Sequence, residues 1–223
     1  MITKLSCPSC GGEVKLHSFN AYVVCAYCRQ ILVRENDAYL ASGEVSEVAD
    51  DYTPYQIDTE GWFLGVHFGL IGRVRLAWEN GFWNEWYVLF DDGRFGWLAE
   101  AQGQLAILFD NVDNDARIDL EVHLRDLRIC TDLLGRHLKI GGVQFIISDI
   151  KQAKTIAAEG ETPKLAMPGS KLTAIDLVAD DGRFATLEFC GKNKVPQFFV
   201  GSWVLHSDLK FSNLRELEGW SPS

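Results

Sequence analysis

Four of the six cysteines form two C-x2-C pairs near the N-terminus, Cys7 with Cys10 and Cys25 with Cys28, and fourteen residues separate the pairs. Two such pairs bring four thiolates together, the tetrahedral ligand set of a structural zinc site, with Zn–S distances of about 2.3 Å. The same residues can form disulfides in an oxidising compartment or hold an iron–sulfur cluster. Zinc is the interpretation we favour. Because four cysteines leave no coordination position open for water, we expect structural Zn2+.

The residues around the cysteines predict the elements that hold them. Short alternating segments at 14–16, 22–24 and 31–33 indicate three strands. With the two cysteine turns they predict a zinc ribbon over residues 1–34. A module this short buries little apolar surface, so we expect the metal to supply most of its folding free energy.

Charge is distributed unevenly along this chain, whose net charge is −10. Residues 1–34 carry four basic residues and one acidic residue, and the remainder carries 17 basic and 30 acidic residues. Binding to phosphate backbones needs clustered Lys and Arg, so the acidic body argues against nucleic acid as a partner. Residues 35–60 hold eight acidic residues and no Lys or Arg, which predicts an acidic linker. An acidic interaction tail is the alternative for this segment.

The hydropathy pattern indicates where the protein resides. No run of eighteen or more apolar residues is present, so no membrane span is expected. The first residues lack the apolar core and cleavage site of an export signal. We therefore expect a cytoplasmic protein.

A tryptophan-rich region follows the linker, with five of the seven tryptophans between residues 62 and 97. Asp91-Asp92-Gly93 separates two runs of aromatic and β-branched residues, which predicts a β-hairpin of strands 85–90 and 94–100. A preceding strand over 70–78 and a following strand over 104–109 complete this predicted module.

A second β-module is predicted from the same kinds of signal, with strands over 143–147, 172–178, 184–189 and 198–205. It echoes the first module weakly, because Asp91-Asp92-Gly93-Arg94-Phe95 recurs as 180–184 and Gly65-Val66-His67-Phe68 resembles 142–145. A pseudo-repeat would explain both matches, although each is also a common turn-and-strand pattern. The surplus length of the second copy is predicted to lie in a loop over 154–171.

These segments predict a mainly β protein with little helix. We expect a zinc ribbon followed by two antiparallel β-modules, each a small barrel of the SH3-like kind or part of a sandwich. Between the modules, 120–124 indicates a strand, and 126–134 is compatible with a strand or a helix. A short helix is predicted within 207–217. The predicted organisation is a ribbon (1–34), a linker (35–60), a Trp-rich module (61–134), a second module (135–206) and a tail (207–223).

Several blocks in these modules carry a family resemblance. The specific block is Asn84-Glu85-Trp86-Tyr87 with Phe90-Asp91-Asp92-Gly93, and supporting blocks are 71–73, 96–98, 159–163 and 185–189. Over residues 61–205 the chain resembles the DUF4178 proteins, a bacterial family without an assigned reaction. The resemblance implies no catalytic residues. It does imply an N-terminal four-cysteine ribbon, common in the family, and genes placed near polyamine-synthesis-like and membrane-protein genes.

No catalytic motif stands out, so we expect no enzyme. There is no P-loop, no Gly-x-Ser-x-Gly and no His-Glu-x-x-His, and the histidines share no motif spacing. Glu159 and Glu161 are the acidic residues most suited to a ligand, because they are predicted to lie in a long loop rather than a tight turn. The other acidic candidates are Asp91, Asp92, Glu100, Asp176, Asp180 and Asp181.

Trp83 and Trp86 are the aromatic candidates for a ligand or partner surface. On a strand, Trp83 and Tyr87 share one face while Asn84 and Trp86 share the other, so both faces are partly aromatic. Core packing against the second module is the alternative, and it is the interpretation we favour for Trp86.

Two functions follow as hypotheses. The first is a non-enzymatic protein that binds another protein through its ribbon and β-modules. The alternative is an enzyme-associated subunit, or a sensor of small cations or polyamines that acts through the acidic loops.

Overall fold

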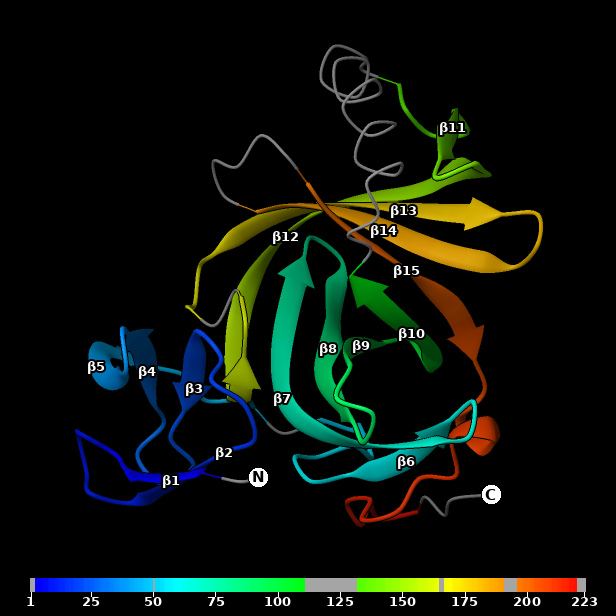
Figure 1. Ribbon diagram of the computed structural model, residues 1–223. Coiled ribbons are helices and arrows are strands. Elements are labelled where there is room, and N and C mark those ends of the chain that lie inside the picture. The colour runs from blue at the N-terminus through cyan, green and yellow to red at the C-terminus, as the bar shows by residue number, and fades with distance from the viewer. Residues whose placement is uncertain (1–2, 50, 111–131, 165–166, 191–195, 220–223) are drawn as a thin grey trace.

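The structure is a computed structural model that describes residues 3–49, 51–110, 132–164, 167–190 and 196–219. It is mainly β, as predicted, and its strands form one large antiparallel sheet that closes on itself, plus a two-stranded hairpin (Figure 1). Among the described residues no helix is long and apolar enough to cross a membrane. The predicted strands over 120–124 and most of 126–134 lie outside the described residues.

The N-terminal ribbon contains the three predicted strands and two more. Its strands are β1 (Thr3–Ser6), β2 (Glu13–Leu16), β3 (Tyr22–Val24), β4 (Gln30–Glu35) and β5 (Ala38–Val45). β1 pairs with β2, and β3, β4 and β5 are consecutive antiparallel neighbours. Strand β5 lies within the segment predicted to be an acidic linker. Pairing with β4 satisfies its backbone groups, a solution that the excess of acidic side chains did not reveal.

The rest of that predicted linker is also attached to the body. The Ser46 hydroxyl donates to the Ala158 carbonyl at 2.9 Å and accepts from the Ala158 N–H at 2.6 Å. The buried Asp51 carboxylate pairs with Arg73 and Arg75 of the first module. The prediction of a solvated linker was therefore wrong, because the acidic residue Asp51 neutralises buried guanidinium groups.

The first module is a five-stranded meander that contains the predicted hairpins. Its strands are β6 (Glu60–Phe63), β7 (Val66–Trp78), β8 (Gly81–Phe90), β9 (Phe95–Ala101) and β10 (Gln104–Asp110). Each strand pairs antiparallel with the next. Trp83 and Tyr87 face one core while Trp86 and Val88 face another, so the predicted division of faces on β8 is confirmed.

The second module is also a five-stranded meander. Its strands are β11 (His137–Ile140), β12 (Val143–Thr162), β13 (Lys171–Ala179), β14 (Arg183–Cys190) and β15 (Gln197–Val204). The predicted strands are confirmed, but β12 runs for 20 residues and takes in much of the predicted 154–171 loop. That loop prediction was wrong because the extra length pairs with β7 and β3, partners remote in sequence.

The two copies of Asp-Asp-Gly-Arg-Phe form the same turn at equivalent places, between the third and fourth strands of each meander. Gly93 has φ +85° and Gly182 has φ +86°. In each turn the second aspartate accepts the backbone N–H of the arginine two residues later at 3.1 Å. Equivalent turns in equivalent topologies support the pseudo-repeat.

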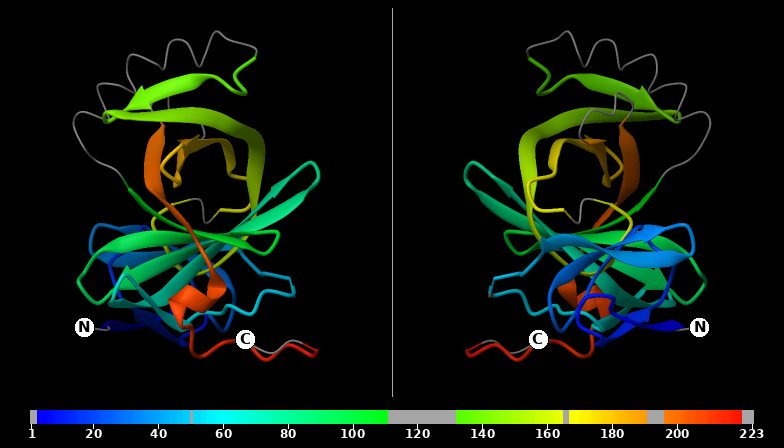
Figure 2. Two further views of the ribbon diagram at one scale, coloured as in Figure 1. Left: turned by 90° about the vertical axis from the view of Figure 1, so that its right-hand side faces the viewer. Right: turned by 90° about the vertical axis from the view of Figure 1, so that its left-hand side faces the viewer.

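The two meanders close into a ring of eight strands with the order β7-β8-β9-β10-β15-β14-β13-β12, and β12 pairs back onto β7 (Figures 1 and 2). The seams therefore join β7 to β12 and β10 to β15, which are equivalent strands of the two copies. Each seam requires a glycine. A Cβ on Gly72 would lie 1.6 Å from the Glu161 carbonyl oxygen, and one on Gly201 would lie 1.7 Å from that of Ile107.

Apolar side chains pack in three places around this ring. One cluster is shared by both meanders and the ribbon, and it includes Val24, Ile31, Tyr87, Trp97 and Phe199. The other two clusters belong to one meander each. The shared cluster means that the ribbon and both meanders bury each other's apolar surface.

The end of the described chain covers the first meander. A single 3-10 helix, η1 (His206–Leu209), replaces the helix predicted within 207–217. Leu209 is buried in the first meander's cluster, and Phe211 and Leu214 pack against it. The helix prediction was wrong beyond Leu209, because apolar contacts with the sheet hold this segment without helical hydrogen bonds.

Candidate functional site

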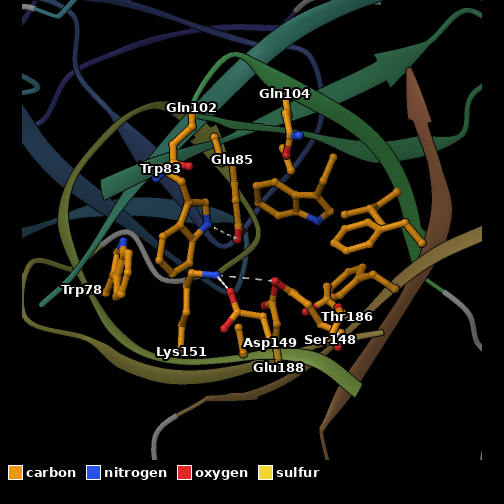
Figure 3. A pocket seen from close by; sticks show the side chains of 18 of the residues that line it. Trp78, Trp83, Glu85, Gln102, Gln104, Ser148, Asp149, Lys151, Thr186 and Glu188 are labelled. Atoms are coloured by element: carbon orange, nitrogen blue, oxygen red, sulfur yellow. Dashed lines mark hydrogen bonds and ion pairs between the residues drawn. The ribbon is translucent and has the colours of Figure 1, made fainter. Parts of the chain in front are cut away.

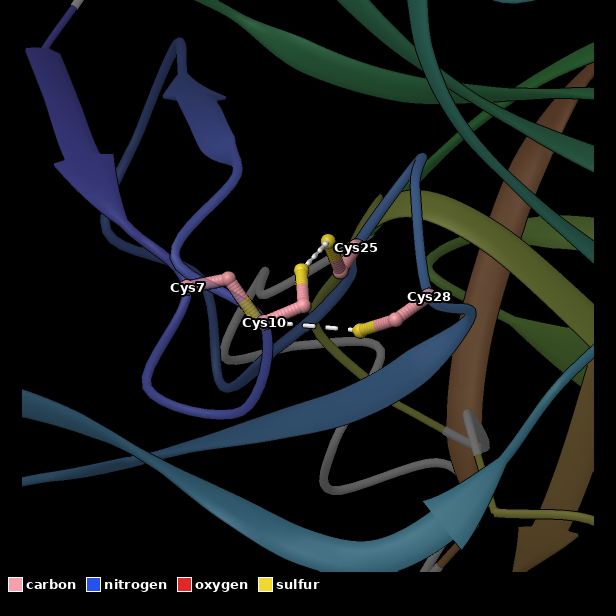
Figure 4. A group of neighbouring side chains, drawn as sticks. All are labelled: Cys7, Cys10, Cys25 and Cys28. Carbon is pink, nitrogen blue, oxygen red and sulfur yellow. Dashed lines mark hydrogen bonds between the residues drawn. The ribbon is translucent and has the colours of Figure 1, made fainter.

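The four N-terminal cysteines form a metal-binding constellation, as the sequence predicts (Figure 4). Their sulfur atoms all lie within 4.8 Å of one another. Cys7 Sγ lies 3.8 Å from Cys28 Sγ, and Cys10 Sγ lies 3.8 Å from Cys25 Sγ. A tetrahedron with metal–sulfur bonds of about 2.3 Å has edges of about 3.8 Å, so the donor set fits a tetrathiolate metal ion.

Both cysteine turns have the same backbone design. The Gly11 N–H donates to the Cys7 carbonyl at 2.8 Å, and the Arg29 N–H donates to the Cys25 carbonyl at 2.9 Å. Gly11 and Arg29 both have positive φ, which orients each turn around its sulfur atoms. The backbone N–H of Gln30 lowers the pKa of Cys28 to about 7, which favours the thiolate form that binds metal.

Glu161, predicted to lie in a ligand-binding loop, instead joins the ribbon to the ring. It lies in β12 and is 1% exposed. Its carboxylate accepts the backbone N–H groups of His17 and Ser18 at 2.5 and 3.0 Å, and side-chain donors of His17, Ser18 and Asn20 complete the shell. The hydrogen bond to Glu161 raises the pKa of His17. Because its oxygens are occupied by these donors, Glu161 is a structural group.

Glu159 is also structural. It lies in β12, and its carboxylate accepts from the Arg73 guanidinium at 3.2 Å. Arg73 is buried, stacks over the Trp86 ring at 4.5 Å, and donates to Asn84 Oδ1. The predicted acidic loop is therefore part of a strand, in which Glu159 anchors Arg73 and Glu161 anchors the ribbon, and it does not present a ligand site.

The two tryptophan candidates have different roles. Trp86 is 0% exposed and packs in the first meander's own cluster, with its indole N–H donating to Glu100 at 3.0 Å. The expectation that Trp86 packs against the second module was therefore wrong. Trp83 lies on the opposite face of β8, half-buried, and lines a cavity inside the ring together with residues of the second meander.

This cavity is the second candidate site (Figure 3). It has a volume of about 470 Å3 and is walled by aromatic side chains, namely Trp78, Phe82, Trp83, Trp97, Phe184, Phe199 and Trp203. Its volume is within the range of small-molecule sites. Phe82 is 50% and Trp203 47% exposed, whereas Trp97 and Phe199 are buried. The cavity therefore has an open outer end and a closed inner end.

Charged groups are distributed along the cavity in two sets. At the outer end Lys151 pairs with Asp149 and lies 3.9 Å from Asp176. At the inner end Lys164, whose side chain lies behind the lining residues, pairs with Glu188 and lies 3.9 Å from Glu85. The two sets together have four carboxyl groups and two ammonium groups. In each set one ammonium group therefore serves two carboxyl groups, and the more distant of the two, Asp176 or Glu85, lies 3.9 Å away.

Those two carboxyl groups have perturbed protonation. Burial and the nearby Glu188 carboxylate raise the pKa of Glu85 to about 7. Burial raises the pKa of Asp176 to about 6, although Lys151 opposes the shift. The Thr186 hydroxyl, opposite Asp176 on β14, is buried without a hydrogen-bond partner of good geometry. Carboxyl groups with too few donors, in a cavity, are the features of a site for a polar or cationic group.

Sequence reasoning missed most of this cavity. Asp176 was among the predicted acidic candidates, but the others do not converge with it: Glu100 accepts from Trp86 and Asn84, and Asp92 and Asp181 serve turns. The available signal was acidic residues in the middle of apolar strands. Glu85 shares its strand face with Trp83 and Tyr87, and Glu188 shares its face with Phe184.

An all-β protein in which a four-cysteine ribbon is fused to a closed ring of two meanders is the class that this fold defines. The model of the family "Domain of unknown function (DUF4178)" matches residues 56–206, which contain both meanders. The chain belongs to this family. No curated protein and no solved structure matches it.

Proposed function

We propose that this protein is a non-enzymatic binding protein whose ring interior takes a small organic ammonium compound. The observation that carries the proposal is the cavity of about 470 Å3, where aromatic walls enclose more carboxyl groups than ammonium groups. The acidic-loop form of a cation sensor is not supported, because Glu159 and Glu161 are engaged in structural contacts.

The aromatic walls favour a cation with an apolar body. Lys151 Nζ already lies 5.5 Å from the Trp78 ring centroid, and Lys164 Nζ lies 4.3 Å from that of Phe199. Ammonium groups over aromatic faces are attracted by the ring quadrupole, more strongly where water is excluded. An added ammonium near Asp176 and Glu85 would also compensate two carboxyl groups that each share their cation with another carboxyl group.

Binding rather than catalysis is supported by the cavity's residue types. The described lining residues include no histidine, cysteine or tyrosine that would act as nucleophile or base beside the carboxyl groups. The four thiolates of the metal centre would fill a tetrahedral shell and leave no site for a substrate.

We also propose zinc as the metal of the cysteine site. Tetrahedral sulfur ligation is the arrangement that zinc takes in structural centres. Thiolates remain available for metal where glutathione keeps them reduced, which suits a cytoplasmic protein.

Calorimetric titration of the full metal-loaded chain at pH 7.5 tests the cavity proposal. Benzylammonium, n-butylammonium and spermidine are the cationic probes, and benzyl alcohol and benzoate are the neutral and anionic controls. We expect at least one amine to bind, and benzoate not to bind. Equal binding of benzoate, or no binding of any amine, would contradict the proposal.

Matched variants locate the binding. Asp176→Asn keeps the side-chain shape and should weaken amine binding at least tenfold. Asp180→Asn removes a charge from an exposed turn only four residues away and should leave the affinity unchanged. Affinity should rise between pH 5.5 and 8, because the Asp176 and Glu85 carboxyl groups ionise in that range while the amine stays charged.

Binding to another protein is the second candidate function. Trp62 is 46% and Leu64 86% exposed around the β6–β7 turn, an apolar pair on the surface of an otherwise acidic chain. Purification of tagged protein from its own host, compared with a Trp62→Ser, Leu64→Ser variant, tests this function. A stoichiometric partner captured by the wild type and lost by the variant is the expected result. Recovery of the same partner by both proteins would rule out this surface.

A further inference from the structure

Lys164 lies at the closed inner end of the cavity, behind the residues that line it. Its ammonium pairs with Glu188 and lies 3.9 Å from Glu85. It also lies 4.9 Å from the Trp97 ring centroid and 4.3 Å from that of Phe199. All four of these residues line the cavity. An alkylammonium is thus already held by two carboxyl groups and two aromatic rings.

Lys164 does not belong to any of the strands that form the ring. It follows the end of β12 at Thr162, in the connection to β13 rather than in a ring strand. Its side chain is only 11% exposed, so a long flexible side chain has been ordered and its ammonium removed from water. Such an arrangement costs conformational and desolvation free energy that only a complementary set of contacts offsets.

We propose that Lys164 is an internal alkylammonium ligand, which fills the inner seat of the cavity and limits an external ligand to one ammonium group at the outer end. The inner seat consists of Glu85, Glu188, Trp97 and Phe199. The second part of this inference rests on the proposed function, and the first part stands on the contacts of Lys164 alone.

The pairing of carboxyl and ammonium groups explains why an external ligand is limited to one ammonium group. With Lys164 in place, Glu188 is paired and Glu85 has an ammonium 3.9 Å away and the Trp83 indole N–H at 3.0 Å. The carboxyl groups of the inner seat therefore already have an ammonium partner. Asp176, which faces Thr186 across the β13–β14 pair and has Lys151 at 3.9 Å, remains for the ligand. Removing the Lys164 ammonium should therefore increase by one the number of ammonium groups that the cavity accepts.

Chemical rescue tests the inner seat directly. Lys164→Ala deletes three carbons and the ammonium, the equivalent of one n-propylammonium ion. We expect tens of millimolar n-propylammonium to raise the melting temperature of Lys164→Ala by several degrees more than that of the wild type, which can bind the ion only at the outer end. n-Propanol, which has the same shape without the charge, should not reproduce the effect. Equal effects of both compounds on the folded variant would overturn the proposal.

Two further measurements keep the test decisive. If Lys164→Ala does not fold alone, refolding with n-propylammonium but not with n-propanol is the expected result, and failure with both overturns the proposal. Lys164→Met fills the seat without a charge, so n-propylammonium should stabilise it no more than the wild type. Stabilisation of Lys164→Met equal to that of Lys164→Ala would show that the amine binds elsewhere.

Calorimetry with amines of one and two charges tests the limit on the external ligand. The wild type should prefer n-butylammonium to 1,4-diammoniobutane, and Lys164→Ala should reverse that preference by at least tenfold. Rescue by n-propylammonium together with no amine binding by the wild type would support the inner seat and overturn the proposed function. An unchanged preference in a variant that binds amines would overturn the limit.

Discussion

Two regions of this molecule bury carboxyl groups, and they use them in opposite ways. At the ribbon–ring junction, Glu161 is surrounded by donors, including the backbone N–H groups of His17 and Ser18. In the ring cavity, Glu85 and Asp176 each have a cation no closer than 3.9 Å. The pKa of Glu85 is raised to about 7 and that of Asp176 to about 6, mainly by burial. Burial alone therefore does not mark a binding site, whereas burial without enough donors does.

The difference has a structural origin. The junction carboxylate meets a ribbon turn whose backbone N–H groups point outward, as in any turn that leaves donors unpaired. The cavity carboxyl groups instead project from ring strands, whose backbone N–H groups are used by strand pairing. Asp149 also accepts the Ile150 backbone N–H at 2.7 Å, but the only cations that the described residues place beside the four carboxyl groups are the two ammonium groups of Lys151 and Lys164.

Loss of the metal should lower the stability of the protein more than any other change, and it should affect the ribbon–ring junction first. We expect one equivalent of zinc per chain, and Cys7→Ser or chelation should cost several kcal/mol. Because Val24 and Ile31 of the ribbon pack in the shared cluster, the melting temperature of the ring should fall too. A ribbon joined to the ring only by the predicted acidic linker would instead unfold without affecting the ring. Metal analysis and calorimetric melting are the measurements, and a ring transition insensitive to chelation would contradict the shared core.

Substitution of Trp83 and Trp86, both on β8, should distinguish a side chain that lines the cavity from one that packs in the core. Trp86→Ala should destabilise the fold by about 3–5 kcal/mol, because the side chain is fully buried. Trp83→Ala should cost about 1 kcal/mol and remove amine binding, because this ring lines an open cavity. Denaturant unfolding and calorimetric titration measure the two effects. Similar destabilisation by both substitutions would show that Trp83 is core.

Removal of the junction carboxylate should release the ribbon. Glu161→Ala leaves the His17 and Ser18 N–H groups without acceptors and should cost about 3 kcal/mol. Hydrogen exchange in β3 and the preceding turn should rise most. Glu159→Ala, two residues earlier on the same strand, is the matched control and should cost about 1 kcal/mol, with ribbon exchange unchanged. Equal ribbon exchange in both variants would refute the role of Glu161.

The smallest effect is the pH dependence of Glu85. Its pKa is about 7 in the folded state against an ordinary value of 4.5, so the folded state binds more protons than the unfolded chain between these values. Stability should therefore fall as pH rises from 5.5 to 8, by about 2 kcal/mol from this group. Glu85→Gln should lack that part of the slope, and Asp180→Asn should keep it. Denaturant unfolding across this range, with the bound metal measured at each pH, checks the sign.

The sequence by itself determined the local parts of the protein. Cysteine spacing specified the metal constellation, because two short turns need only nearby residues. The hairpins around Gly93 and Gly182 were predictable for the same reason, since residues with positive φ favour those turns. The alternation along β8 also assigned Trp83 and Trp86 to opposite faces correctly.

Only the tertiary structure decided what those faces meet. Residues 160–162 of β12 pair with β3 of the ribbon, and Ala157 and Glu159 of the same strand pair with β7. These long-range pairings turned a predicted loop into a strand and two predicted ligand residues into anchors. Ring closure likewise brought Glu85, Asp176 and Glu188 into one cavity, from three strands whose sequences show nothing of their neighbours. Local signals specify turns and faces, but pairing between distant strands depends on the backbone closure of the whole ring.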